Sequence, residues 1–267
     1  MSVKKILIFN WKMAPQSLSE AKRLLTNYKR PITNNEENKK EIVVASPSVY
    51  LVYLSSLSSV VGRKSSVKLG AQDVFYENSG AYTGEISPKM LKNLGVKYVI
   101  IGHSERRKYL GETDEMINKK VLAVLKAGLK VILCVGEPTR SIKYKVESIK
   151  QAKNYIKKQL EKDLKKVSNI KYQVSRNLIV AYEPVWAISG SHSDTPEDAL
   201  EMIKYIKQTL NSKFYILNSR VLYGGSVNSK NIGDFLKRPE IDGALIGHAS
   251  LKVEEVKKII EIASKIV

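Results

Sequence analysis

Cysteine is almost absent from the chain, because Cys134 is the only one among 267 residues. A single thiol forms no intrachain disulfide and no cysteine-based metal site, and it fits a reducing cytoplasm, where we expect the protein to work. Long apolar runs are missing too. The apolar segment near the N-terminus ends after four residues, which is too short for a signal peptide, and no stretch approaches the length of a membrane span.

Acidic residues are few beside basic ones, since 45 Lys and Arg against 26 Asp and Glu give a net charge of +19. Such an excess suggests an anionic partner or a lysine-rich surface. Eleven basic and three acidic residues lie between Thr139 and Lys171, yet apolar residues recur there at spacings of three or four, from Ile142 to Val167. This is typical of a helix with one buried stripe, and no aromatic ladder is interleaved with the lysines. We therefore expect no specific nucleic-acid partner.

Short apolar segments alternate with longer amphipathic ones along the chain. The expected strands cover 5–10, 41–46, 67–72, 97–102, 130–136, 177–183, 220–225 and 242–247, and the expected helices lie near 17–30, 48–61, 87–94, 113–127, 142–167, 196–212, 229–237 and 252–266. Ser17, Ser87, Thr113 and Thr195 are helix start signals. The strands are rich in Val, Ile and Leu without strict alternation, as in strands buried on both faces.

Eight alternating strand–helix pairs indicate parallel strands joined by helical crossovers. An open doubly wound sheet has the same order of elements, but its glycine-rich phosphate turn is missing from "IFNWKMAPQS" (8–17), which has no glycine. The count and the length of about 250 residues favour a closed (β/α)8 TIM barrel, with eight parallel strands surrounded by helices. We expect one domain over residues 1–267.

Polar side chains follow the expected strands at their carboxyl ends, where such barrels carry their active sites. They are Asn10 and Lys12 after the first strand, His103, Ser104 and Glu105 after the fourth, Glu183 after the sixth, Gly224, Gly225 and Ser226 after the seventh, and Gly247 and His248 after the eighth. A carboxylate base with a neutral hydrogen-bond donor and an ammonium suits proton abstraction next to a carbonyl. The turns after the last two strands offer backbone N–H groups to a phosphate. One histidine and scattered acids make a poor metal shell, so we expect no metal.

Each residue alone has a plainer interpretation. Glu183 alone reads as a helix cap or ion-pair partner, His103 as a structural hydrogen-bonder, and Lys12 as a surface lysine. Their joint placement at three strand ends outweighs these interpretations. Two alternatives stay open at this point: another phosphate-binding barrel enzyme, such as an aldolase or a synthase, and a basic nucleic-acid-binding barrel. An aldolase needs a Schiff-base lysine, for which Lys12 is the only candidate at a strand end.

Seven stretches, in the same order, resemble the triosephosphate isomerase family along the whole chain. They are "NWKM" (10–13), "GAYTGEIS" (80–87), "GHSERR" (102–107), "CVGE" (134–137), "AYEPVWAI" (181–188), "YGGSV" (223–227) and "GALIG.ASL" (243–251). By this resemblance the enzyme interconverts dihydroxyacetone phosphate and D-glyceraldehyde 3-phosphate, in glycolysis and gluconeogenesis, and has no cofactor. In that family a glutamate base acts with a neutral histidine electrophile while a loop closes over the site.

The resemblance also assigns roles to residues. Glu183 matches the base, His103 the electrophile, Lys12 the lysine that neutralises the anionic substrate, and Asn10 the polar residue beside it. Ser104 matches the serine that contacts the base before closure, Glu105 the acid behind the site, and Tyr223 the latch of the lid over 184–194. Phosphate-binding positions match Ser189, Gly224, Gly225, Ser226, Gly247 and His248, and Thr83 in the loop 72–87 matches a residue that a homodimer inserts beside the partner's site.

The chain departs from the family pattern at three places. The lid ends in Ser189-Gly190-Ser191-His192 where the family has Gly-Thr-Gly-Lys, and His248 replaces a glycine of the phosphate turn. The segment "PTRSIKYK" (138–145) lacks the acidic residues common there.

For Arg106 and Arg107 we expect structural ion pairs or a dimer contact, and for Cys134 a place in the packed core.

Overall fold

A closed parallel barrel forms the centre of the computed structural model, which describes residues 4–28, 40–57, 67–140, 145–170, 174–188 and 194–266. Within these ranges the strands are β1 (Lys5–Asn10), β2 (Lys40–Ser46), β3 (Val67–Ala71), β4 (Tyr98–Ile101), β5 (Lys130–Val135), β6 (Leu178–Tyr182), β7 (Arg220–Tyr223) and β8 (Gly243–Ile246). They follow one another around the barrel in sequence order, and β1 pairs with both β2 and β8, so the sheet closes on itself. The predicted barrel is confirmed.

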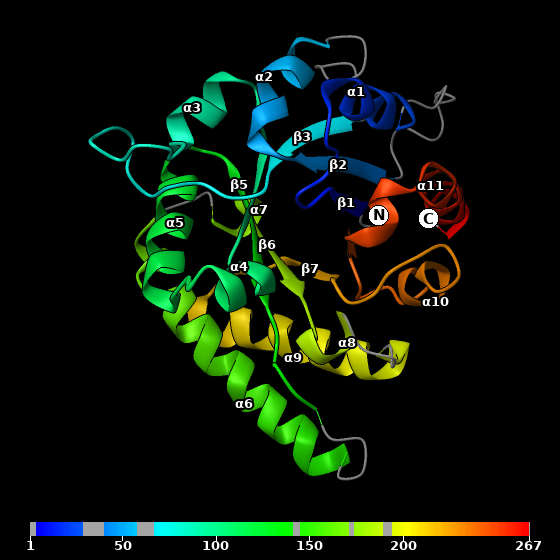
Figure 1. Ribbon diagram of the computed structural model, residues 1–267. Coiled ribbons are helices and arrows are strands. Elements are labelled where there is room, and N and C mark those ends of the chain that lie inside the picture. Colours follow the sequence, from blue (N-terminus) through cyan, green and yellow to red (C-terminus); the bar gives the residue numbers. More distant parts are fainter. Residues whose placement is uncertain are drawn as a thin grey trace.

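Helices surround the barrel (Figure 1). They are α1 (Leu18–Thr26), α2 (Ser48–Ser56), α3 (Pro88–Asn93), α4 (Ser104–Tyr109), α5 (Asp114–Lys126), α6 (Lys145–Asp163), α7 (Val174–Asn177), α8 (Val185–Ile188), α9 (Pro196–Phe214), α10 (Ile232–Leu236) and α11 (Val253–Ile266), with the 3-10 turns η1 (Val167–Asn169) and η2 (His248–Leu251). The four start signals are confirmed, because Ser17, Ser87, Thr113 and Thr195 each accept a backbone N–H through their side chains. The short helices α7 and α8, which lie directly before and after β6, were not among the expected elements.

The strands are buried on both faces. Alternate residues such as Ile6 and Ile8 fill the inside of the barrel, and Leu7 and Phe9 pack outward against the helices. This two-sided burial explains why the strand sequences are continuously apolar. The barrel interior is a packed core, so polar groups gather at its ends.

The helix predicted over 142–167 ends earlier in the structure. Among the described residues it covers Lys145–Asp163, and it ends there because Lys166 adopts a left-handed conformation with φ of 62° and a 3-10 turn follows. Residues 142–144 lie outside the described part of the chain. The apolar stripe is confirmed from Ala152 to Val167, whose side chains are buried.

The connection after β3 extends away from the barrel, as the cyan loop in Figure 1 shows. Its residues 77–85 are all exposed.

Among the described residues we find no helix with the length and apolar character that a membrane crossing requires.

Candidate active site

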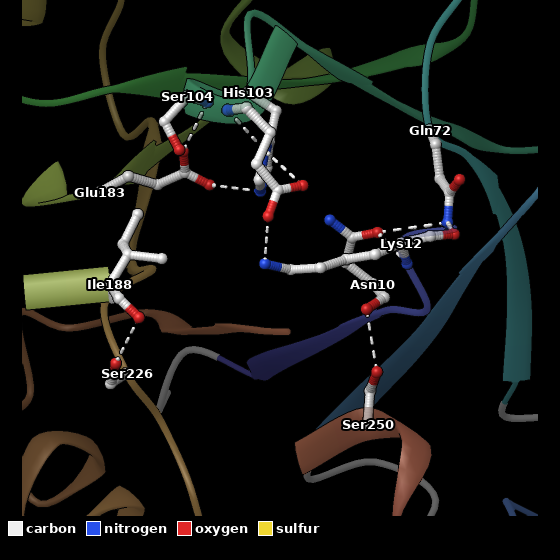
Figure 2. A network of polar contacts seen from close by, with 10 residues as sticks. Asn10, Lys12, Gln72, His103, Ser104, Glu183, Ile188, Ser226 and Ser250 are labelled. Carbon is white, nitrogen blue, oxygen red and sulfur yellow. Dashed lines mark hydrogen bonds and ion pairs between the residues drawn. The ribbon is translucent and has the colours of Figure 1, made fainter. Parts of the chain in front are cut away.

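Glu183 follows β6 directly, and its side chain is only 2% exposed. Its backbone N–H donates to Val135 O at 2.7 Å, which fixes the position of the chain after the strand. One carboxylate oxygen, Oε1, lies 3.3 Å from His103 Nε2, and the other, Oε2, accepts the backbone N–H of Ser104 at 3.2 Å (Figure 2). The carboxylate is therefore oriented by the first residues after β4.

His103 caps the short helix α4. Gly102 precedes it with φ of 71°, a left-handed conformation that favours glycine, and so turns the chain from β4 into the helix. His103 Nδ1 accepts the backbone N–H of Glu105 at 3.3 Å. An accepting ring nitrogen carries no proton, so the proton of the neutral ring sits on Nε2, which faces Glu183. The Glu105 carboxylate is 3.6 Å from Nδ1, too far for a hydrogen bond.

Lys12 lies on the other side of His103 from Glu183 (Figure 2). It has φ of 53°, a conformation that costs energy for a residue with a side chain. Three hydrogen bonds hold it there: Asn10 Oδ1 accepts the Lys12 N–H at 2.9 Å, and Gln72 Nε2 donates to Lys12 O at 2.8 Å and to Asn10 Oδ1 at 3.3 Å. The Lys12 ammonium contacts the carboxylate of Glu105. The backbone strain thus serves to aim this cation into the site.

A cavity of about 570 Å³ lies between these side chains and the turns that follow β7 and β8. Several backbone N–H groups in these turns have no hydrogen-bond partner in the described part of the chain, among them those of Gly225, Ser226, Gly247 and His248. Gly224 differs, because its N–H donates to Tyr182 O at 2.8 Å. A Cβ at this position would lie 2.9 Å from Glu183 Cγ, so the glycine leaves room for the carboxylate.

Other predicted residues lie around this cavity. Ser226 Oγ donates to Ala187 O at 2.8 Å and to Ile188 O at 3.0 Å, so it holds the end of α8 (Figure 2). The Tyr223 hydroxyl is buried and has no hydrogen-bond partner among the described residues. Thr83 is exposed in the loop after β3, away from the cavity lining. Ser189 and the rest of the altered hinge, residues 190–192, lie outside the described residues.

The expected structural ion pairs of the two arginines are present. Arg106 lies 2.7 Å from Asp73 and 3.2 Å from Glu112, and Arg107 lies 2.6 Å from both Asp114 and Asp163.

The predicted packing of Cys134 is confirmed, because its side chain belongs to the cluster inside the barrel. Burial raises the pKa of the thiol, and the nearby Glu183 carboxylate raises it further.

Two supporting groups were missed at the sequence level. Gln72 also donates to Ala45 O at 3.1 Å, so one amide joins the ends of β1, β2 and β3. The only signal in the sequence was the position of Gln72 directly after β3. Arg140 lies in "PTRSIKYK", where the sequence offered no sign of burial. Its side chain is nevertheless only 5% exposed, and its Nη2 donates a hydrogen bond to the Tyr182 hydroxyl at 2.7 Å.

Comparison with known proteins agrees with this geometry. Residues 5–263 match the family model described as triosephosphate isomerase. Proteins named triosephosphate isomerase are 43% identical to the chain in Thermoanaerobacter pseudethanolicus and in Caldanaerobacter subterraneus subsp. tengcongensis, each over 96% of this chain and 98% of the relative. A protein of the same name from Dictyoglomus thermophilum is 41% identical over 97% of this chain and 99% of its own length. The chain therefore belongs to the triosephosphate isomerase family.

Proposed function

We propose that this chain interconverts dihydroxyacetone phosphate and D-glyceraldehyde 3-phosphate with Glu183 as the base. The observation that carries the proposal is the arrangement of Glu183, His103 and Lys12, which reach one cavity from three different strands. A family match over residues 5–263 removes the support for an aldolase, a synthase or a nucleic-acid-binding barrel. No cofactor is needed, because the reaction only moves protons between neighbouring atoms.

The proton is carried by one carboxylate. Glu183 removes a proton from the substrate carbon next to the carbonyl, which leaves an enediolate and a neutral carboxylic acid. The same group returns the proton to the adjacent carbon while the hydroxyl proton of the first carbon passes to the oxygen of the second, so the carboxylate is regenerated and the carbonyl and hydroxyl groups exchange positions. Its contacts with His103 and Ser104 hold it at the edge of the cavity.

His103 stabilises the enediolate as a neutral donor. Its Nε2–H is directed into the site because Nδ1 is occupied by the Glu105 N–H. A hydrogen-bond donor placed where negative charge develops lowers the activation barrier of the proton transfer. Nitrogen NMR of the ring at neutral pH should show a protonated Nε2 and an unprotonated Nδ1. A doubly protonated ring would contradict this role.

The phosphate is proposed to lie against the turns after β7 and β8. The free N–H groups of Gly225, Ser226, Gly247 and His248 are suitable donors, and the Lys12 ammonium balances the charge of the dianion. Gly224 takes part by making room for the base, since its own N–H is used by Tyr182 O. Residues 184–194, including Ser189, are proposed as a lid, and a crystal structure with a substrate analogue tests whether the Ser189 N–H reaches the phosphate.

We also propose a homodimer formed through the loop 72–87. Residues 77–85 are exposed, and Met13 beside Lys12 is 90% exposed, so the described part of the chain covers neither surface. Sedimentation analysis should give a dimer at assay concentrations, and a fully active monomer would contradict it. The cytoplasmic location and the single domain over 1–267 stay predictions.

The test of the base is Glu183→Gln, assayed by coupling product formation to a dehydrogenase. We expect correct folding and a kcat lower by several orders of magnitude, because a neutral amide accepts no proton from carbon. Glu201→Gln is the matched control, since Glu201 is an exposed residue paired with Lys153 at 2.6 Å. A kcat of Glu183→Gln within a few-fold of wild type would rule the assignment out.

A further inference from the structure

A buried charged network lies behind the site, outside the cavity lining. Arg140 is its centre. Its Nη2 lies 2.9 Å from Glu137 Oε1 and 2.7 Å from the Tyr182 hydroxyl, and its Nη1 lies 3.5 Å from Asp194 Oδ1. The guanidinium also sits over the ring of Trp186, 5.2 Å from the ring centroid. One side chain from the connection after β5 therefore reaches both ends of the segment between β6 and α9.

This network is a poor source of stability. The side chains of Arg140, Glu137 and Asp194 are 5%, 2% and 0% exposed, so one guanidinium and two carboxyl groups are withdrawn from water together. Arg140 Nε, Glu137 Oε2 and Asp194 Oδ2 are buried without a hydrogen-bond partner in the described part of the chain. Buried charges with unused hydrogen-bonding capacity stabilise a fold no better than apolar side chains of similar volume. Its geometry therefore points to another role.

The network is connected to Glu183 through its chain neighbours. Glu137 Oε1 accepts the Tyr182 hydroxyl at 3.0 Å and Trp186 Nε1 at 2.9 Å, and Glu137 O accepts the Val185 N–H at 3.1 Å. Residues on both sides of Glu183 are thus fixed to Glu137.

Arg140 sets the position of Glu137 in turn, because the guanidinium fork contacts the same Oε1 and the Tyr182 hydroxyl. At the far end of the segment, Asp194 Oδ1 accepts the Thr195 N–H at 3.0 Å, directly before α9. The anchoring of the segment at α9 is therefore also linked to Arg140.

We propose that Arg140 is a positioning residue for the carboxylate of Glu183, acting through Glu137, Tyr182 and Asp194. It touches neither the substrate nor the reacting atoms. The inference rests on the proposed role of Glu183 as the base, since only then does a displaced carboxylate slow the reaction. A shift of the base by a fraction of an ångström affects the proton transfer and leaves phosphate binding at the turns after β7 and β8 unchanged.

The test compares Arg140→Met and Arg140→Lys with wild type. For Arg140→Met we expect kcat at least tenfold lower and KM within threefold of wild type. Lysine keeps the charge but carries it on one nitrogen, whereas Arg140 reaches Glu137 through Nη2 and Asp194 through Nη1, so Arg140→Lys should recover part of the loss and remain more than threefold below wild type.

Arg220→Met is the matched control. Arg220 is also largely buried and pairs with Glu41 at 3.1 Å, but it lies at the start of β7, at the opposite end of the barrel. We expect this variant to keep the wild-type kcat even where it lowers the free energy of unfolding. An equal loss of kcat in Arg220→Met would show a merely structural effect and overturn the proposal.

Two outcomes separate this inference from the proposed function. A wild-type chain without isomerase activity defeats the proposed function, whereas an active wild type with a full kcat in Arg140→Met defeats only the role of Arg140. If Arg140→Met does not fold, Arg140→Lys decides, and a kcat within twofold of wild type overturns the inference.

Discussion

Gly224→Ala tests how closely the structure confines the base. The added Cβ would lie 2.9 Å from Glu183 Cγ and 3.3 Å from Tyr182 O. Carbon atoms in favourable contact are about 3.5 Å apart, so Cγ has to move by about 0.6 Å. The carboxylate is held by His103 Nε2 and the Ser104 N–H, and a shift of this size lengthens at least one of these contacts.

The expected magnitude follows from this shift. A misplacement of about 1 Å costs about 100-fold in rate, so about 0.6 Å should lower kcat by roughly 10- to 20-fold. KM should stay within about threefold of wild type, because the Gly224 N–H already donates to Tyr182 O and is not free for the phosphate.

The assay measures kcat and KM separately with a coupled dehydrogenase. Gly233→Ala in α10 is the control, since its Cβ would have an ordinary contact of 3.4 Å with Ile262, and its kcat should not change. A tenfold higher KM with an unchanged kcat in Gly224→Ala would refute the reasoning, because it would show that the glycine serves the phosphate and not the base.

Three further predictions concern buried charged or ionisable groups. Lys120→Met should lower the free energy of unfolding by about 3–5 kcal/mol in guanidinium titrations, because Lys120 Nζ lies 2.8 Å from both oxygens of Asp73 and also contacts the buried Glu112; a change below about 1 kcal/mol would contradict this. Burial raises the pKa of Asp194 from 3.8 to about 7, so the folded state binds more protons between these values and its stability falls as the pH rises through this interval. Asp194→Asn removes this contribution. The free energy of unfolding of the wild type minus that of the variant should therefore decrease from about pH 4 to pH 7 and stay constant above pH 7, and a difference that rises with pH would contradict the prediction. The buried Cys134 thiol should not react with a thiol reagent until the protein is unfolded. Rapid labelling of the native protein would show that the reagent reaches Cys134 and would contradict the prediction.

The sequence predicted the barrel because its strands and helices differ strongly in pattern. Each strand is apolar on both faces, and the start of a helix is marked by a residue such as Thr113 or Thr195. The site could be located as well, since carboxyl ends of parallel strands meet at one edge, and so Lys12, His103 and Glu183 had to face a common space. The sequence pattern did not show where the long helix ends, because the left-handed conformation of Lys166 has no glycine to mark it.

What the sequence did not predict are polar contacts between residues far apart in the chain. Gln72 joins three strand ends through one amide, and an isolated glutamine after a strand has no pattern that distinguishes it from a surface residue. Arg140 stands in a basic segment whose composition suggests a solvated surface, and its burial follows only from its contacts with Tyr182 and Asp194. The positive φ of Lys12 likewise depends on Gln72 and Asn10 and not on the local sequence.

The order of the strands explains how these supporting contacts arise. The three proposed catalytic side chains follow β1, β4 and β6, and the neighbours of β1 and β6 contribute supporting groups. Ser250 after β8 donates to Asn10 O at 2.8 Å, and Glu137 after β5 anchors the residues around Glu183. Backbone hydrogen bonds between neighbouring strands hold the strand ends together. A supporting side chain after one strand therefore orients the residue after the next strand without entering the cavity. Substitutions at these neighbouring strand ends should therefore alter the position of the reacting groups more than the binding of the phosphate.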